Sequence, residues 1–196
     1  MHERGFRLAF AVLGLTAFSV STGFRLRADK LGGRMSRGSE HPCVRTALSA
    51  AGILMLLIAA LYVLRPTWLR WSQVPLPASL RWLAVGVATL CLPLLTWVLG
   101  TLGQNITPTV TTRSQHSLVV TGPYRWVRHP LYTVSLIFWA SLGVIAANGL
   151  MLVLLAGAFV VLVIRTPAEE ARLLERFGEV YQTYCERTGR FLPHSW

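Results

Sequence analysis

Two stretches of the 196-residue chain concentrate polar side chains beside long apolar runs. The first runs from His116 to Tyr132 and contains the sequence Gly-Pro-Tyr-Arg-Trp-Val-Arg-His-Pro. The second begins at Arg165 and includes Glu169 and Glu170. A carboxylate accepts hydrogen bonds from hydroxyl or ammonium groups, and an arginine offers a planar, two-pronged donor to a carboxylate. These residue types indicate a site for a polar or charged ligand next to apolar segments.

The charged residues of the chain are few and bunched. They make up 14% of the sequence, against about 25% in an average soluble domain, and 53% of the residues are hydrophobic. Four segments without Asp, Glu, Lys or Arg lie between Arg7 and Arg25, Arg45 and Arg65, Arg81 and Arg113, and Arg128 and Arg165. Each is close to or above the roughly 18 apolar residues that cross a hydrocarbon core. The composition excludes a soluble domain, a disordered tail and a disulfide scaffold, and it predicts an integral membrane protein.

The apolar segments predict an all-α fold with five transmembrane helices. The last charge-free segment has 36 residues, too many for one span at a rise of 1.5 Å per residue. Asn148-Gly149 near its middle predicts a turn. We therefore expect a helical hairpin over about residues 131–147 and 149–164, preceded by spans over residues 8–24, 47–64 and 81–102.

The net charge of +11 indicates topology rather than nucleic-acid binding, because the cations flank the apolar segments as the positive-inside rule requires. The loop over residues 25–45 carries six Lys and Arg. We expect this loop, the loop after the third span and the C-terminus to face the cytoplasm, with the N-terminus outside. A bacterial inner membrane is the expected location.

From Thr166 onward the apolar residues recur at spacings of three and four, with charged residues on the opposite side. This pattern predicts an amphipathic cytoplasmic helix at the membrane surface. Thr166 as N-cap, Pro167 at the first position and Glu169 closing a capping box predict its first turn. Thr188-Gly189 predicts its end.

The predicted hairpin makes the two polar stretches neighbours, because both lie at the inner ends of the last two spans. A helix-bundle mouth with a few convergent polar groups is a default ligand site. Arg125 and Arg128 are expected to act as anchors at the membrane interface.

Here the residues match a known pattern, Gly122-Pro-Tyr-Arg-x-x-Arg-His-Pro-x-Tyr132 followed by Arg165-x-x-x-Glu169-Glu170-x-x-Leu173-x-x-x-Phe177-Gly178-x-x-Tyr181-x-x-Tyr184. It resembles the isoprenylcysteine carboxyl methyltransferase family and, more broadly, the membrane methyltransferases that include bacterial phospholipid N-methyltransferases. The resemblance covers roughly residues 80–193. It divides the chain into a two-span region with a basic loop (residues 1–75) and a methyltransferase core (residues 76–196). It implies S-adenosylmethionine as cofactor at the cytoplasmic face and a lipid-like acceptor that enters from the bilayer.

The resemblance also implies roles for single residues. The cofactor would be held by a strand before the turn, by the turn, by the start of the fourth span and by the tail, at His116, Ser117, Leu118, Val119, Tyr124, His129, Pro130, Leu131, Tyr132 and Glu169. Arg165 would bind the acceptor and act in catalysis. Glu170 or His129 would accept a proton from an amine acceptor. No metal is expected.

Several interpretations stay open at this point. The acceptor that we favour is the carboxylate of a prenylcysteine-like molecule, and the alternative within the same class is a phospholipid amine. Alternatives from other classes are a nicotinamide-dependent membrane reductase and a non-enzymatic membrane adaptor. For Glu169, the local sequence favours a helix cap, whereas the resemblance favours a cofactor ligand.

Overall fold

The computed structural model describes residues 2–31, 42–103 and 118–194, and this part of the chain is helical, without a strand. The α-helices are α1 (His2–Leu31), α2 (Pro42–Leu64), α3 (Ala78–Leu102), α4 (Pro130–Ile145), α5 (Gly149–Phe177) and α6 (Glu179–Arg187). Two short 3₁₀ helices, η1 (Pro66–Ser72) and η3 (Gly122–Arg125), precede α3 and α4. The predicted all-α class is confirmed.

Four of these helices, α1, α2, α3 and α5, are long and apolar enough to cross a membrane, as expected of an integral membrane protein. α4 is apolar but has only 16 residues, about 24 Å at a rise of 1.5 Å per residue. The fifth predicted span therefore stays a prediction, and so does the division of the chain after residue 75.

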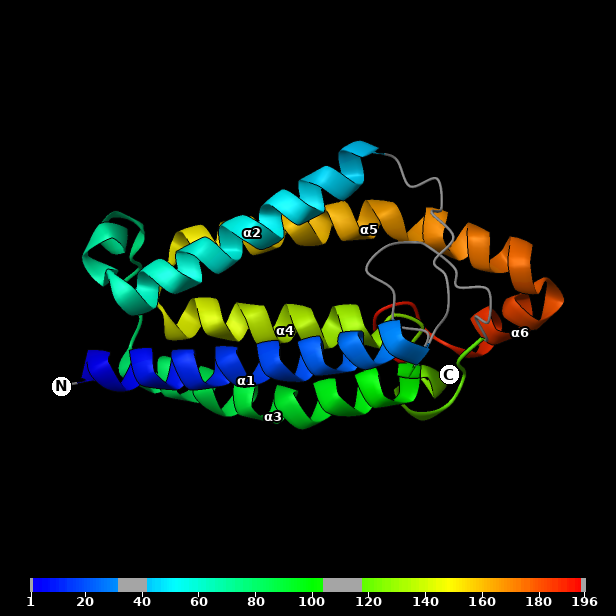
Figure 1. The fold of residues 1–196 in the computed structure, drawn as a ribbon, viewed down its shortest axis with the longest axis horizontal. Helices are drawn as coiled ribbons and strands as arrows, with labels where there is room; N and C mark the ends of the chain where they lie inside the picture. Colours follow the sequence, from blue (N-terminus) through cyan, green and yellow to red (C-terminus); the bar gives the residue numbers. More distant parts are fainter. Residues whose placement is uncertain (1, 32–41, 104–117, 195–196) are drawn as a thin grey trace.

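The helices form an elongated bundle in which α1 packs against α3 and α4, and α2 packs along α5 (Figure 1). The N-terminus, η1 and the α4–α5 turn gather at one end of the bundle. The other end carries η3, the start of α4, α6 and the last described residues. We refer to this second end as the motif end, because residues 122–132 lie there. α2 diverges from α1 toward the motif end (Figure 1).

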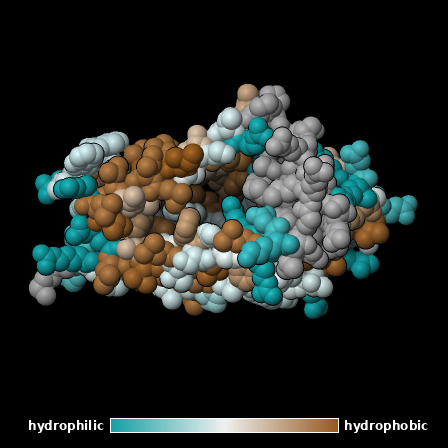
Figure 2. Space-filling model, viewed as in Figure 1, coloured by the Kyte–Doolittle hydropathy of each residue, from teal (hydrophilic) through white to brown (hydrophobic). Residues whose placement is uncertain are grey.

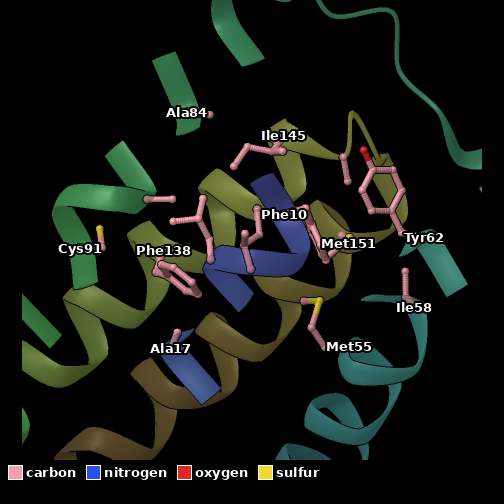
Figure 3. Packing of buried hydrophobic residues seen from close by; sticks show 14 of the residues in the cluster. Phe10, Ala17, Met55, Ile58, Tyr62, Ala84, Cys91, Phe138, Ile145 and Met151 are labelled. Atoms are coloured by element: carbon pink, nitrogen blue, oxygen red, sulfur yellow. The ribbon is translucent and has the colours of Figure 1, made fainter. Parts of the chain in front are cut away.

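Small side chains let α3 approach its neighbours closely. Ala84, Ala88 and Cys91 are buried at helical spacing on one face of α3, an arrangement typical of packed membrane helices. The buried cluster draws on all five long helices, with Phe10, Tyr62, Ala84, Phe138 and Met151 among its members (Figure 3). Apolar side chains also cover much of the outer surface (Figure 2), as helices that face lipid require.

The predicted turn at Asn148-Gly149 is confirmed, and it is tied to η1. The Asn148 side chain caps α5 by accepting a hydrogen bond of 3.0 Å from the Met151 amide. Its amide nitrogen donates to the Ser72 hydroxyl at 2.7 Å. The Val74 amide donates to the Ala147 carbonyl at 2.9 Å. The buried Asn148 side chain thus joins the hairpin to the preceding loop.

The predicted capping box at Thr166 is wrong, because α5 continues through Pro167 without interruption. Thr166 is buried and its hydroxyl donates to the Leu162 carbonyl at 2.7 Å, so it behaves as an interior helical residue. A proline inside a helix costs about 3 kcal/mol. Contacts that Glu169 and Glu170 make with the start of α4, described below, offset this cost.

The tail pattern predicted one helix, whereas the structure divides it at Gly178. This residue has a φ of 55°, a left-handed conformation that glycine adopts without a steric penalty. Its amide donates to the Leu174 carbonyl at 2.8 Å and ends α5. α6 then returns toward α4 and ends before Thr188, where the sequence predicted the end of the tail helix.

Arg81 joins four helices at the end of the bundle opposite the motif end. Its guanidinium is buried, donates to the Ile145 carbonyl at 2.9 Å and to the Tyr62 hydroxyl at 3.4 Å, and pairs with Glu3. It also lies 3.9 Å from the centroid of the Phe6 ring. The sequence placed Arg81 only at the start of a span, and it could not predict these distant partners.

Candidate functional site

The Gly-Pro-Tyr motif forms a tight turn that brings the chain to the start of α4. Gly122 has a φ of 58°, and a Cβ atom there would lie 2.7 Å from the Thr101 hydroxyl oxygen, so the turn requires glycine. Tyr124 is buried, and its carbonyl accepts a hydrogen bond of 2.7 Å from the Tyr184 hydroxyl. Burial raises the pKa of Tyr184 to about 12, so this hydroxyl keeps its proton and remains a donor. The turn is thereby fixed against α6.

Tyr132 and Glu169 connect the two polar stretches directly. The Tyr132 hydroxyl donates to the Glu169 carboxylate at 2.8 Å. The rings of His129 and Tyr132 are stacked, with centroids 5.3 Å apart and planes 6° apart. Because α4 and α5 run antiparallel from the Asn148 turn, the first turn of α4 lies beside the part of α5 that follows Pro167. The juxtaposition that the hairpin predicted is therefore present.

Glu170 is the centre of a cluster of basic side chains. Its carboxylate oxygens accept hydrogen bonds from Arg128 Nε at 2.9 Å and from Arg190 Nη2 at 2.6 Å. His129 Nε2 lies 3.3 Å from the same carboxylate. The hydrogen bond between Arg190 and Glu170 raises the pKa of Arg190 above its ordinary value. Glu170 is 12% exposed, so the cluster is a shielded ionic tie between α4, α5 and the C-terminal segment.

Arg128 connects segments within the protein and is not the membrane anchor that the sequence predicted. Besides Glu170, it donates to the Cys185 carbonyl at 2.9 Å and to the Thr188 carbonyl. Its side chain is only 12% exposed, because the end of α6 folds over it. Arg125, by contrast, is exposed, and its predicted role as an anchor stays a prediction.

The C-terminal segment, which we define as Thr188–Phe191, pairs with the backbone ahead of α4. The Arg128 amide donates to the Gly189 carbonyl at 2.8 Å, and the His129 amide donates to the Arg190 carbonyl at 3.0 Å. A Cβ at Gly189 would lie 1.8 Å from the Leu192 carbonyl oxygen. Sequence reasoning read Gly189 only as a helix end and missed this pairing, since nothing local to Thr188-Gly189 reveals its distant partner.

The remaining predicted site residues divide into four groups. His129 and Pro130 are buried, and Leu131 is half-buried, at the start of α4. Arg165 is half-buried, with a buried Nε. It lies four residues before Glu169 and therefore on the same face of α5. Two positions, Leu118 and Val119, are described but lie in no helix or strand, so the predicted strand is not formed there. The other two, His116 and Ser117, lie outside the described residues.

An apolar cavity of about 660 Å³ lies between α1, α2, α3 and α4. Leu131, which directly follows the His129-Pro130 pair, lines it. The volume falls within the roughly 300–1,000 Å³ of known ligand pockets. A hollow between apolar side chains is visible on the molecular surface (Figure 2). The predicted cofactor segment therefore borders a space suited to an apolar group.

Comparisons with known proteins agree with the motifs. Residues 83–175 match the isoprenylcysteine carboxyl methyltransferase (ICMT) family model. The nickel-cobalt-cadmium resistance protein NccN of Alcaligenes xylosoxydans xylosoxydans is 33% identical over 81 residues, which are 41% of this chain and 38% of that protein. The methanethiol S-methyltransferase of Pseudomonas sp. (strain GM41(2012)) is 38% identical over 71 residues, 36% of this chain and 26% of that enzyme. The matched segments thus span well under half the length of either relative.

A solved structure shares the fold. The eukaryotic intramembrane Ras methyltransferase ICMT aligns with a TM-score of 0.52 and 23% identity, over 80% of this chain and 54% of that chain. At this identity the likeness concerns the fold alone. The match over residues 83–175 and the two relatives support the resemblance of this chain to the isoprenylcysteine carboxyl methyltransferase family that the motifs indicate.

Proposed function

We propose that this protein transfers a methyl group from S-adenosylmethionine to a lipophilic acceptor, and that the acceptor group is the carboxylate of a prenylcysteine-like molecule. The observation that carries the proposal is the hydrogen bond between Tyr132 and Glu169. It brings the two motif blocks, residues 122–132 and 165–184, together in one site at the motif end. The match of residues 83–175 to the family model supports the methyl transfer, and the apolar cavity beside Leu131 supports the lipophilic acceptor.

The donors and acceptors at this site fit S-adenosylmethionine. Glu169 is half-buried, and a carboxylate there can accept hydrogen bonds from ribose hydroxyls or from the ammonium group. The His129 and Tyr132 rings and the buried Pro130 supply an apolar wall beside it. When bound, the cofactor supplies a methyl group already activated by its sulfonium. The chain then needs chiefly to align the acceptor, which can contribute about 7–11 kcal/mol to lowering the barrier.

A carboxylate acceptor suits the basic side chains of the site. It is ionised at neutral pH and needs no general base, but it does need a cation to hold it. Arg165 can fill this role, because it lies on the Glu169 face of α5 and a guanidinium binds a carboxylate with two parallel hydrogen bonds. Arg165 is accordingly the residue that we assign to the acceptor.

Glu170 fits a positioning role better than that of a proton acceptor. Its oxygens already accept hydrogen bonds from two guanidinium groups, those of Arg128 and Arg190. Taking up a proton would weaken both of these charge-assisted bonds. An amine acceptor, which must lose a proton, is therefore less well served by this site than a carboxylate.

A thiol is the second candidate acceptor, favoured by the similarity to an enzyme named methanethiol S-methyltransferase. A thiolate is also an anion that Arg165 can hold. Methanethiol itself would leave most of a 660 Å³ apolar cavity unused. A thiol on a longer hydrocarbon chain would fill that space as well as a prenyl group does.

We further propose that the motif end faces the cytoplasm of a bacterial cell, because most of the basic residues that the structure describes lie there. Arg25, Arg27 and Lys30 lie at the end of α1, and Arg172 and Arg176 lie near the end of α5. With five spans, this orientation leaves the N-terminus outside the cell.

Transfer of a labelled methyl group tests the proposal. The purified protein in detergent, supplied with S-adenosylmethionine, is assayed with an S-farnesylcysteine derivative, phosphatidylethanolamine and a long-chain alkanethiol. The proposal predicts transfer to the first and none to phosphatidylethanolamine. Transfer to the thiol alone would replace the carboxylate by the second candidate. Labelling of phosphatidylethanolamine alone would overturn the assignment of an anionic acceptor.

A further inference from the structure

The N-terminal helices α1 and α2 supply most of the lining of the 660 Å³ cavity. Both helices lie outside residues 83–175, the segment that matches the family. The cavity therefore borders the predicted cofactor segment through α4, at Leu131, while the part of its wall that α1 and α2 form belongs to a region that the family match does not cover.

The lining changes character along α1. It is apolar at Phe10, and it becomes polar at Ser21, Thr22 and Arg25 toward the motif end. The distance from Phe10 to Arg25 along the helix axis is about 22 Å, at a rise of 1.5 Å per residue. A space with one polar end and one long apolar arm matches the shape and polarity of an amphiphile. Its polar group would lie at the motif end, and its hydrocarbon chain would extend toward Phe10.

Two glycines keep this space open. Gly14 of α1 and Gly52 of α2 both line the cavity, and a Cβ atom built on either meets no other atom within 4 Å. The contrast is Gly143 of α4, where a Cβ atom would lie 2.6 Å from a side-chain carbon of Leu152. Gly14 and Gly52 are helical residues without a left-handed φ. Larger side chains at these two positions would therefore extend into the cavity without straining the backbone.

We propose that α1 and α2 form the chamber for the hydrocarbon chain of the acceptor, and that Gly14 and Gly52 determine how long a chain it admits. The nature of the occupant rests on the proposed function, whereas the chamber itself rests on the cavity and its lining. Each methylene buried in an apolar chamber improves binding by about fourfold. Acceptor affinity consequently increases with chain length until the chain meets the wall at Phe10.

A series of S-alkylcysteines of increasing chain length tests the chamber through the KM of methyl transfer. In Gly14→Leu and Gly52→Leu, the KM of the longest acceptors rises by about fifteenfold, the contribution of roughly two methylenes. Short acceptors and the affinity for S-adenosylhomocysteine are unaffected. The matched control is Gly23→Leu, on the same helix as Gly14, with open space at its Cβ position and no part in the lining.

Photolabelling gives a readout that does not require turnover. An S-alkylcysteine with a diazirine at the end of its chain should label α1 and α4 near Phe10 and Phe138, and Gly14→Leu should reduce this labelling. Absence of methyl transfer with labelling at these residues would refute the proposed function and leave the chamber standing. Normal transfer with the same chain-length profile in both leucine variants, and labelling elsewhere, would refute the chamber and leave the function standing.

Discussion

The Tyr132 hydroxyl donates a hydrogen bond of 2.8 Å to the Glu169 carboxylate, which connects the first turn of α4 to α5 beyond Pro167. Neither residue is a neighbour of the other in sequence. The helical hairpin that turns at Asn148 brings them together. The same hairpin brings Arg128 to Glu170. The two adjacent carboxylates therefore have different partners. Glu169 faces Tyr132, and Glu170 is enclosed by basic side chains.

Removing the Tyr132 hydroxyl should weaken cofactor binding. In Tyr132→Phe, Glu169 loses the donor that orients it, and a single hydrogen bond contributes about 1 kcal/mol, or roughly fivefold in affinity. The heat of binding of S-adenosylhomocysteine measures the change. Tyr62→Phe is the matched control, because its hydroxyl contacts Arg81 at the opposite end of the bundle. If Tyr132→Phe and Tyr62→Phe bind S-adenosylhomocysteine with equal affinity, Tyr132 takes no part in binding the cofactor.

Glu170 should contribute mainly to stability. In Glu170→Gln, Arg128 and Arg190 lose a charged partner, and charge-assisted bonds of this kind contribute about 1.5–3 kcal/mol each. Arg190 is partly exposed, so its share is at the low end. We expect a clearly lower Tm in detergent than for Glu175→Gln, a change at an exposed position on the same helix. An unchanged Tm, with loss of transfer only to amine acceptors, would instead favour Glu170 as a proton acceptor.

The C-terminal segment should detach from α4 when Gly189 acquires a side chain. In Gly189→Ala, the new methyl group collides with the Leu192 carbonyl, so the pairing with Arg128 and His129 has to open. Hydrogen exchange at the amides of these two residues should accelerate. Gly157→Ala, a glycine on α5 with open space at its Cβ position, should leave their exchange unchanged. Continued protection in Gly189→Ala would contradict the close packing of this segment.

Arg81 should stabilise the bundle without affecting the cofactor site. Arg81→Met removes the donor to the Ile145 carbonyl and the partner of Glu3, at a cost of about 2 kcal/mol. The expected result is a lower Tm with an unchanged affinity for S-adenosylhomocysteine. Arg4→Met, at an exposed position on α1, serves as control. A weaker affinity in the folded Arg81 variant would indicate that the two ends of the bundle are coupled.

Arg165 should distinguish the classes of acceptor. Lysine keeps the positive charge but loses the two-pronged geometry that a carboxylate requires. Arg165→Lys should therefore reduce kcat/KM for a carboxylate acceptor by about tenfold or more, with little change for an amine. The ratio of the two rates in the same preparation is the measurement. A uniform loss with both acceptors would assign Arg165 to a structural role.

Local sequence rules predicted those features of the fold that depend on local physics. The turn at Asn148 follows from a break in an apolar segment that is too long for one helix, and α2 ends at Leu64, the predicted end of the second span, just before Arg65-Pro66. The same kind of rule failed at Pro167, where a strong local signal for a helix start is outweighed by contacts with α4. Keeping a proline inside a helix costs about 3 kcal/mol, and tertiary contacts can exceed that amount.

The candidate site was predictable where a motif carries it and unpredictable where distant backbone groups complete it. The pairing of the two motif blocks follows from the hairpin, so the proximity of Tyr132 and Glu169 could be inferred. The ties of Arg128 to the Cys185 and Thr188 carbonyls could not. An arginine beside an apolar segment is equally consistent with a membrane anchor. Only the path of the chain after α6 distinguishes the two roles.

Binding of S-adenosylhomocysteine to the wild-type protein and to Glu169→Ala tests the central claim most directly. Titration calorimetry in detergent should give micromolar affinity for the wild type and for Glu175→Ala, and no measurable binding for Glu169→Ala. Unchanged affinity in Glu169→Ala, or tight binding of a nicotinamide dinucleotide in place of S-adenosylhomocysteine, would contradict a methyltransferase site at the mouth formed by α4 and α5.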